Sequence, residues 1–119
     1  MGEVMRRVLV CGGRDYADRP QMFYTLDEAH RVDPIACVIH GGAPGADRLA
    51  KEWAILNGIP QEEYKAKWAV YGNYAGPARN HEMLLFGKPD IVLAFPGGKG
   101  TKDMIRQARK AKVQVVEYA

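Results

Sequence analysis

The chain has 119 residues, of which 47% are hydrophobic and 26% are charged, and its formal net charge is +3. This length and composition are typical of one globular domain, residues 1–119, that buries its core without disulfides or metals. The small, dispersed positive charge disfavours binding to nucleic acid, and no apolar run has the length of a membrane span.

The start of the chain predicts a strand followed by a glycine turn and a helix. Residues 7–11, an arginine followed by four apolar residues, predict the strand, which ends at the glycine pair Gly12 and Gly13. Asp18 is placed to cap a helix, whose apolar residues recur at helical spacing up to the break at residues 33–34.

A second unit of the same kind follows. Residues 35–39 predict a strand, residues 40–45 a glycine-rich turn, and the residues from Ala46 onward a helix with one apolar face. Asn57 and Gly58 end that helix.

The second half of the chain begins less regularly and ends with two strands. Residues 61–66 predict a charged strand at a sheet edge, residues 68–77 a loop rich in aromatic side chains, and residues 79–86 a helix. Residues 90–95 are apolar enough for a fully buried strand, and residues 112–118 predict the last strand.

Between these two strands lies a turn, Pro96-Gly-Gly-Lys-Gly-Thr101, that opens a helix. Its glycines let backbone N–H groups approach a ligand, and the helix start adds about half a positive charge, so the turn predicts an anion site. The alternative is a tight connection without a ligand. The turn is not a Walker loop, because Lys99 precedes Gly100, and Asp103 stands where a Rossmann fingerprint has its third glycine.

Alternating strands and helices predict an α/β fold, a Rossmann-like three-layer sandwich with a five-stranded parallel sheet. Right-handed crossovers and short connections favour the strand order 3-2-1-4-5. Ligands in such sheets bind at the carboxyl ends of the strands where the order reverses. The three glycine turns are therefore expected to converge on one crevice.

The start of the chain and its cysteines indicate a cytoplasmic protein. The first seven residues lack the hydrophobic region of a signal peptide. Cys11 and Cys37 lie in separate apolar runs, which indicates buried, reduced thiols. His30, His40 and His81 share no metal-ligand spacing, so a structural metal is not expected. No cofactor is expected either.

Four segments, in order, resemble a known family. Residues 96–101 resemble the Pro-Gly-Gly-x-Gly-Thr-x-x-Glu signature of the Lonely guy phosphoribohydrolases. Taken whole, the chain is similar to the YspA-related branch of the SLOG superfamily, which also includes the Rossmann domain of DNA-processing protein A. The resemblance also rests on Val-Cys-Gly-Gly-Arg-Asp at residues 10–15, His-Gly-Gly-Ala-Pro-Gly-Ala-Asp at 40–47 and Gly-Pro-Ala-Arg-Asn at 76–80. It extends through Lys-Pro-Asp-x-Val-Leu-Ala-Phe-Pro-Gly-Gly at 88–98.

The resemblance implies a Rossmann-like domain, usually a homodimer, that binds a nucleotide or nucleotide derivative such as AMP or ADP-ribose. Lonely guy enzymes act on an N-glycosidic bond with an arginine, matched here by Arg79, and the glutamate that ends the signature. Met104 holds that glutamate's position and can neither transfer a proton nor stabilise positive charge. We therefore expect a sensor or sequestering module. The alternative is an N-glycosidase in which Asp47, Glu82 or Asp103 replaces the missing acid.

The candidate site residues come from the three turns and the helix before the last turn. The ligand-binding candidates are Gly12, Gly13, Arg14, Gly41, Gly42, Gly45, Asp47, Arg79, Asn80, Pro96, Gly97, Gly98, Lys99, Gly100 and Thr101. The catalytic candidates, should the chain be an enzyme, are Arg79, Glu82 and Asp103. The expected partners are a small nucleotide-type ligand and further copies of this chain in a homodimer or larger homo-oligomer.

Several of these residues have a second interpretation. Thr101 either contacts phosphate or caps its own helix, with Gly100 as the other possible cap. Arg14 either grips phosphate or pairs with Asp15 at the surface. Asp47 either accepts from ribose hydroxyls or complements the helix dipole.

Arg79 and the aromatic residues also have alternatives. An arginine at a helix N-terminus opposes the macrodipole, which favours a functional role for Arg79, although it could instead pair with Glu82. Trp68, Tyr71 and Tyr74 either stack on a base or bury a dimer contact, and we expect one of them to touch a ligand.

Overall fold

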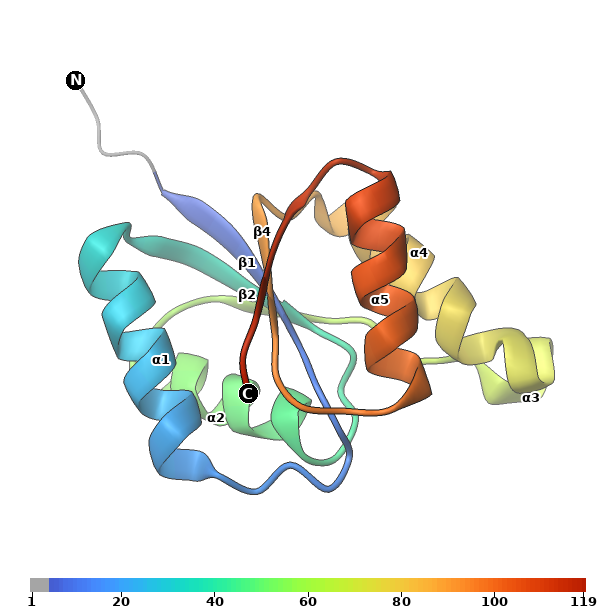
Figure 1. Ribbon diagram of the computed structural model, residues 1–119, viewed down its shortest axis with the longest axis horizontal. Coiled ribbons are helices and arrows are strands. Elements are labelled where there is room, and N and C mark those ends of the chain that lie inside the picture. Colours follow the sequence, from blue (N-terminus) through green and yellow to red (C-terminus); the bar gives the residue numbers. More distant parts are fainter. Residues whose placement is uncertain (1–4) are drawn as a thin grey trace.

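The structure is a computed structural model that describes residues 5–119, and it forms a three-layer α/β sandwich (Figure 1). Its elements in chain order are β1 (Arg6–Cys11), α1 (Arg19–Val32), β2 (Ile35–His40), α2 (Ala46–Leu56), β3 (Gln61–Glu63), α3 (Trp68–Tyr71), the 3-10 helix η1 (Gly72–Tyr74), α4 (Ala75–Gly87), β4 (Ile91–Ala94), α5 (Lys99–Lys110) and β5 (Gln114–Glu117).

All five strands are parallel, and their order in the sheet is β3-β2-β1-β4-β5. This confirms the predicted fold class and strand order. The sheet order reverses between β1 and β4, which pair in the register Val10 opposite Leu93.

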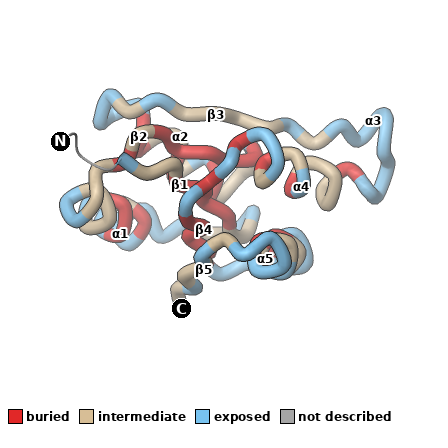
Figure 2. Tube along the Cα trace, turned by 90° about the horizontal axis from the view of Figure 1, so that it is seen from above, coloured by how far each residue is buried: buried red, intermediate tan, exposed pale blue. Residues whose placement is uncertain are grey.

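The two faces of the sheet are covered by different helices, and the buried layer runs between them (Figure 2). Helices α1 and α2 pack on the face that carries Val8 and Val10, whereas α4 and α5 pack on the face that carries Leu9 and Cys11. This division follows from the alternation of side chains along a strand. The central strands are buried on both sides and position the loops at their carboxyl ends.

The first helix begins as its sequence predicts. Asp18 is the N-cap of α1, and its Oδ1 accepts a hydrogen bond from the backbone N–H of Gln21 at 3.1 Å. Pro20 lies in the first turn, where its missing N–H costs nothing.

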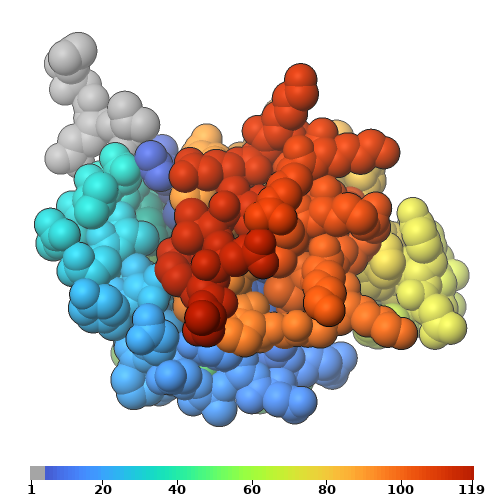
Figure 3. All heavy atoms as spheres, in the orientation of Figure 1, coloured from blue at the N-terminus to red at the C-terminus, as the bar shows by residue number. Residues whose placement is uncertain are grey.

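The predicted loop at residues 68–77 is wrong. This segment forms α3, η1 and the first turn of α4, and it projects at one end of the molecule (yellow in Figure 3). Gly72 ends α3 with a φ of 58°. Pro77 lies in the first turn of α4, where proline is tolerated, so it does not break the helix there.

Other boundaries differ by a few residues. β3 ends at Glu63 and β5 spans residues 114–117, so both edge strands are shorter than predicted. α5 begins at Lys99, inside the turn at residues 96–101 that was expected to precede the helix. Within residues 5–119, no helix combines the length and apolar character needed to cross a membrane.

Candidate functional site

A cleft of about 790 Å³ opens at the carboxyl ends of β1 and β4, where the strand order reverses. Its volume lies in the range of small-molecule sites, about 300–1,000 Å³. The lining residues are Cys11, Gly12, Gly13, Arg14, Asp15, Tyr16, Ala17, Asp18, Ala43, Asp47, Trp68, Gly76, Arg79, Asn80, Pro96, Gly97, Gly98, Lys99, Gly100 and Thr101.

Backbone hydrogen bonds fasten the three glycine turns to one another. The N–H of Gly13 donates to the carbonyl of Pro96 at 2.8 Å, and the N–H of Ala46 donates to the carbonyl of Gly13 at 3.1 Å. A Cβ on Gly13 would lie 2.9 Å from the Pro96 carbonyl oxygen, so only glycine permits this approach. The turns after β1, β2 and β4 therefore meet at one point.

The glycines of the second turn serve this packing and do not line the cleft. Gly45 has a φ of 83°, and a Cβ there would lie 2.6 Å from the carbonyl carbon of Arg14. Gly41 and Gly42 likewise lie outside the lining, while Ala43 and Asp47 from the same segment belong to it. In this structure, the second turn reaches the cleft through those two residues.

The first turn of α5 presents backbone donors to the cleft. Gly98 is the N-cap of α5 and has no side chain with which to occupy them. The amide groups of residues 97–101 have no hydrogen-bond acceptor within residues 5–119. Gly98 and Gly100 are exposed, and a Cβ on either would meet no atom within 4 Å. Such a helix start binds anions through its N–H groups and its dipole.

The structure settles which residue caps α5. Gly98 is the cap, so the interpretations that place the cap at Gly100 or Thr101 are wrong. Thr101 is the third helical residue, and its hydroxyl packs so closely on Gly97 that a Cβ on Gly97 would clash with it.

Arg79 brings a guanidinium to the lining of the cleft. It is the fifth residue of α4, so the prediction that it begins a helix is wrong, and so is the macrodipole argument drawn from it. Its Nη1 donates to the carbonyl of Gly41 at 2.9 Å, and its Nε donates to Oδ1 of Asn80 at 3.1 Å. It forms no ion pair with Glu82 or any other carboxylate of the described chain.

The charge of Arg79 is poorly compensated. Burial lowers the pKa of Arg79, the charge of Asp47 acts in the opposite direction, and the nearby charge of Arg14 lowers it further. Arg14 is exposed on the cleft wall and forms no ion pair with Asp15 in residues 5–119. Two like charges that line one cleft favour an anion near both of them.

Asp47 shapes the second turn and also faces the cleft. Its Oδ2 accepts hydrogen bonds from the N–H groups of Gly41 and Ala43, at 3.1 and 3.2 Å. Burial raises the pKa of Asp47, whereas these N–H groups and the charge of Arg79 oppose the rise. Both bonds use one oxygen, so Oδ1 is left for a ligand hydroxyl.

Asn80 ties α4 to the start of α5. Its Nδ2 donates to the carbonyl of Gly100 at 3.2 Å and to Oδ2 of Asp103 at 3.0 Å. Asp103 also accepts from Arg106 and from Gln107. Asn80 thereby fixes the donor-bearing turn against the helix that carries the guanidinium.

The three catalytic candidates do not meet in the cleft. Arg79 lines it, whereas Glu82 and Asp103 are absent from the lining. Met104, at the position of the family's glutamate, is fully buried in the core beneath α5. Of the acids that were considered as replacements, Asp47 is the one in the cleft.

The lining includes residues that sequence reasoning missed. Cys11, Asp15, Tyr16, Ala17, Asp18, Ala43 and Gly76 were not among the ligand-binding candidates. Cys11 directly precedes the first glycine pair, and residues 15–18 follow shortly after it. Their position next to the end of β1 could have identified them as candidates. Burial, followed by the charge of Asp47, raises the pKa of the Cys11 thiol to about 12. Cys11 is therefore protonated at neutral pH and is a poor nucleophile.

One of the three aromatic residues in the 68–77 segment reaches the cleft. Trp68 lines it and is 55% exposed, so its ring is open to a flat ligand. Tyr71 and Tyr74 contact each other edge to face, with ring centroids 6.5 Å apart. In residues 5–119, no group of three or more His, Cys, Asp or Glu side chains could hold a metal ion.

Comparison with known proteins identifies related sequences. The model of the family described as "YspA, cpYpsA-related SLOG family" matches residues 6–71, from β1 to the end of α3. Gene 61 protein of Mycobacterium phage D29 is 41% identical over 124 residues, which cover 96% of this chain and 97% of that protein.

Two solved structures share the fold. The Moco carrier protein from Chlamydomonas reinhardtii matches with a TM-score of 0.60 at 17% identity, over 96% of this chain and 76% of that one. DNA processing protein A from Streptococcus pneumoniae matches with a TM-score of 0.51 at 16% identity, over 94% of this chain and 58% of that one. At these identities the likeness shows the fold alone.

Proposed function

This chain belongs to the YspA, cpYpsA-related SLOG family, and we propose that it binds a nucleotide or nucleotide derivative in the cleft as a sensor or sequestering module. AMP and ADP-ribose are the representative ligands. The observation that carries the proposal is the meeting of the unoccupied amides of residues 97–101 with the guanidinium of Arg79 on one cleft.

The anion end of the cleft suits a phosphate group. Backbone N–H groups at a helix start and the guanidinium of an arginine both donate hydrogen bonds to phosphate oxygens. The Arg14 and Lys99 side chains add positive charge at the rim. A phosphate there would offset the burial of Arg79 and its repulsion from Arg14.

The remaining lining suits the rest of a nucleotide. Oδ1 of Asp47 can accept from a ribose hydroxyl, and the exposed ring of Trp68 can stack on a base. The buried, apolar Met104 supports binding without turnover, because the position of the family's acid faces the core. Moco joins the ligand panel because a protein of the same fold is named as its carrier.

A thermal-shift panel of AMP, ADP-ribose, Moco and related ligands tests the proposal. A ligand at a hundred times its dissociation constant should stabilise the protein by about 2.7 kcal/mol. For a domain of this size the melting temperature should rise on the order of 10 °C. No shift with any nucleotide or sugar phosphate would contradict the proposal.

Hydrolysis of an N-glycosidic bond is the second candidate function. It is favoured by Asp47, an acid with a raised pKa beside Arg79 in the cleft. Water would add to the sugar carbon as its bond to the base breaks, the base would take a proton from Asp47, and the proton released by the water would restore Asp47. Chromatography of AMP incubated with the protein should then show free adenine, and Arg79→Ala should abolish its release. Unaltered release from Arg79→Ala would place the chemistry elsewhere.

A second copy of this chain is the proposed macromolecular partner, in the cytoplasm. Besides Trp68, which lines the cleft, the α3–η1 segment carries the exposed apolar residues Val70, Tyr71 and Tyr74 at one end of the molecule (Figure 3). A dimer contact would cover apolar surface of this kind. Sedimentation of the purified protein should give a dimer, and a monomer at all concentrations would contradict the assignment.

A further inference from the structure

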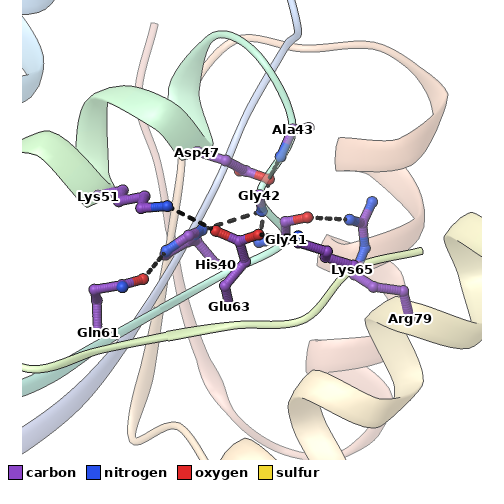
Figure 4. Close-up of polar contacts among 10 residues, drawn as sticks. All are labelled: His40, Gly41, Gly42, Ala43, Asp47, Lys51, Gln61, Glu63, Lys65 and Arg79. Carbon is purple, nitrogen blue, oxygen red and sulfur yellow. Dashed lines mark hydrogen bonds and ion pairs between the residues drawn. The ribbon is translucent and has the colours of Figure 1, made fainter. Parts of the chain in front are cut away.

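His40 is a fully buried polar residue that does not line the cleft. It is the last residue of β2 and lies directly before the second glycine turn. Its Nδ1 accepts a hydrogen bond from the N–H of Gly42 at 3.1 Å, and its Nε2 bonds to Oε1 of Gln61 (Figure 4). An amide oxygen only accepts, so Nε2 is the donor to Gln61 and Nδ1 is the acceptor from Gly42.

The hydrogen bond from Gly42 fixes one end of a single peptide unit. The N–H of Gly42 and the carbonyl of Gly41 belong to the same planar trans peptide, so they point in opposite directions. His40 holds the N–H end, and Nη1 of Arg79 donates to the carbonyl end at 2.9 Å (Figure 4). The ring and the guanidinium are therefore joined through one rigid group.

The orientation of this peptide plane depends on hydrogen bonds from other residues, because both Gly41 and Gly42 are glycines. Glycine populates positive and negative φ with similar ease, and Gly42 has a φ of 70°. Asp47 bonds the N–H of Gly41, which belongs to the preceding peptide, so it does not fix the Gly41–Gly42 plane. If that plane turned, the carbonyl would leave Arg79 and the N–H would leave His40.

Within residues 5–119, the side chains that hydrogen-bond this peptide are those of His40 and Arg79. Glu63 covers Gly42 so closely that a Cβ on Gly42 would lie 2.7 Å from its Cδ. Glu63 is in turn held by Lys51 at 3.1 Å and Lys65 at 3.7 Å (Figure 4). These ion pairs fix the end of β3 and make no bond to the Gly41–Gly42 peptide.

We propose that His40 is a positioning residue for Arg79, acting through the Gly41–Gly42 peptide to hold the guanidinium in the cleft. The Nδ1 lone pair keeps the Gly41 carbonyl aimed at Nη1, and the guanidinium keeps its free donors aimed at the ligand anion. The proposal rests on the proposed function in so far as Arg79 binds that anion.

Three variants separate positioning from a general effect on the fold. His40→Asn retains an acceptor close to the position of Nδ1, whereas His40→Leu removes it. Lys51→Ala disturbs the neighbouring ion pair with Glu63 and leaves the peptide's bonds in place. Each is compared with the wild type by calorimetric titration with AMP at pH 7.5 and by NMR of the Arg79 Nε–H without ligand.

His40→Leu should weaken AMP binding about tenfold, the effect of about one lost hydrogen bond, and should shift the Arg79 Nε–H signal. His40→Asn and Lys51→Ala should stay within about threefold of the wild type. Wild-type affinity and an unchanged Arg79 signal in His40→Leu would overturn the proposal. So would a His40→Asn variant as defective as His40→Leu.

Two further outcomes are distinguishable. If wild-type protein does not bind AMP, the proposed ligand fails, and the Arg79 signal in the variants still decides the positioning role. If His40→Leu does not fold, the ring nitrogens of wild-type His40 decide it. The Nε2–H tautomer with an unprotonated Nδ1 is required, and a protonated Nδ1 at pH 7.5 would overturn the proposal.

Discussion

Arg79 holds a positive charge in a partly buried position where its protein partners are a carbonyl and an amide oxygen. Neutral acceptors satisfy the hydrogen-bonding groups of a guanidinium but do not neutralise its charge. The remaining donors therefore favour an anionic ligand over water. This residue links the fold to the proposed function most directly.

Arg79→Met should separate folding from binding. The variant keeps the apolar stem but loses the charge, so the two hydrogen bonds to Gly41 and Asn80 are exchanged for relief of a partly buried cation. We expect a free energy of unfolding within about 1 kcal/mol of the wild type. The thermal shift with AMP should be lost.

The matched control is Arg31→Met, which removes an exposed arginine paired with Glu28 away from the cleft. It should leave both the stability and the AMP-induced shift unchanged. A shift that survives in Arg79→Met would show that the guanidinium does not contact the ligand.

Cys11 predicts a specific alkaline effect on stability. Burial raises the pKa of its thiol from 9.0 to about 12, so the folded state favours the neutral form. The contribution to stability is fully present below pH 9.0 and is lost as the pH rises toward about 12. Urea unfolding of the wild type should therefore weaken more between pH 8 and pH 11 than that of Cys11→Ala. Equal losses in the two proteins would contradict the burial of this thiol.

At the scale of elements, the start of α5 combines a weak helix former with an open site. Gly100 is the second residue of α5, and a Cβ there would meet no protein atom within 4 Å. Packing therefore does not require glycine at this position, and the proposed approach of a ligand to the backbone would account for it.

Gly100→Ala should raise stability and lower affinity. Replacing glycine by alanine near a helix start should stabilise the fold by about 0.5–1 kcal/mol. The added methyl should obstruct a phosphate at the amides, so AMP binding should weaken. The control Lys102→Ala alters the same turn at an exposed residue and should retain affinity. Unchanged affinity in Gly100→Ala would place the ligand away from this turn.

The elements that sequence predicted best were those with strong periodicity. The buried strand at residues 90–95 and the amphipathic helix from Ala46 both appear close to their expected bounds, as β4 and α2. Residues 68–77 were misjudged because Gly72 and Pro77 are breakers in most contexts. Here Gly72 ends the short helix α3 and Pro77 lies in the first turn of α4. The local sequence pattern alone does not reveal these positions.

At the scale of the whole molecule, chain connectivity predicted where the three turns would meet. Right-handed crossovers fix the strand order, and the order fixes which strand ends are neighbours. The sequence did not separate glycines that line the cleft from those that only allow turns to touch. Gly45 and Gly98 look alike in sequence, yet a Cβ on the first would strike Arg14 and a Cβ on the second would face open space.

The net charge of the whole molecule bears on nucleic-acid binding. The net charge of +3 provides little attraction for a phosphate backbone. We expect a labelled single-stranded oligonucleotide not to bind at physiological salt, as measured by fluorescence anisotropy. Tight binding with a steep salt dependence would revive a nucleic-acid role and contradict the small-ligand proposal.

The central claim is that three backbone turns meet at the sheet's reversal point and together hold an anion. A crystal structure of the wild-type protein grown with AMP tests this most directly. The account predicts the AMP phosphate within hydrogen-bond distance of the amides of residues 97–101 and of the Arg79 guanidinium. A phosphate bound elsewhere, or amides of residues 97–101 bonded to the protein itself, would contradict it.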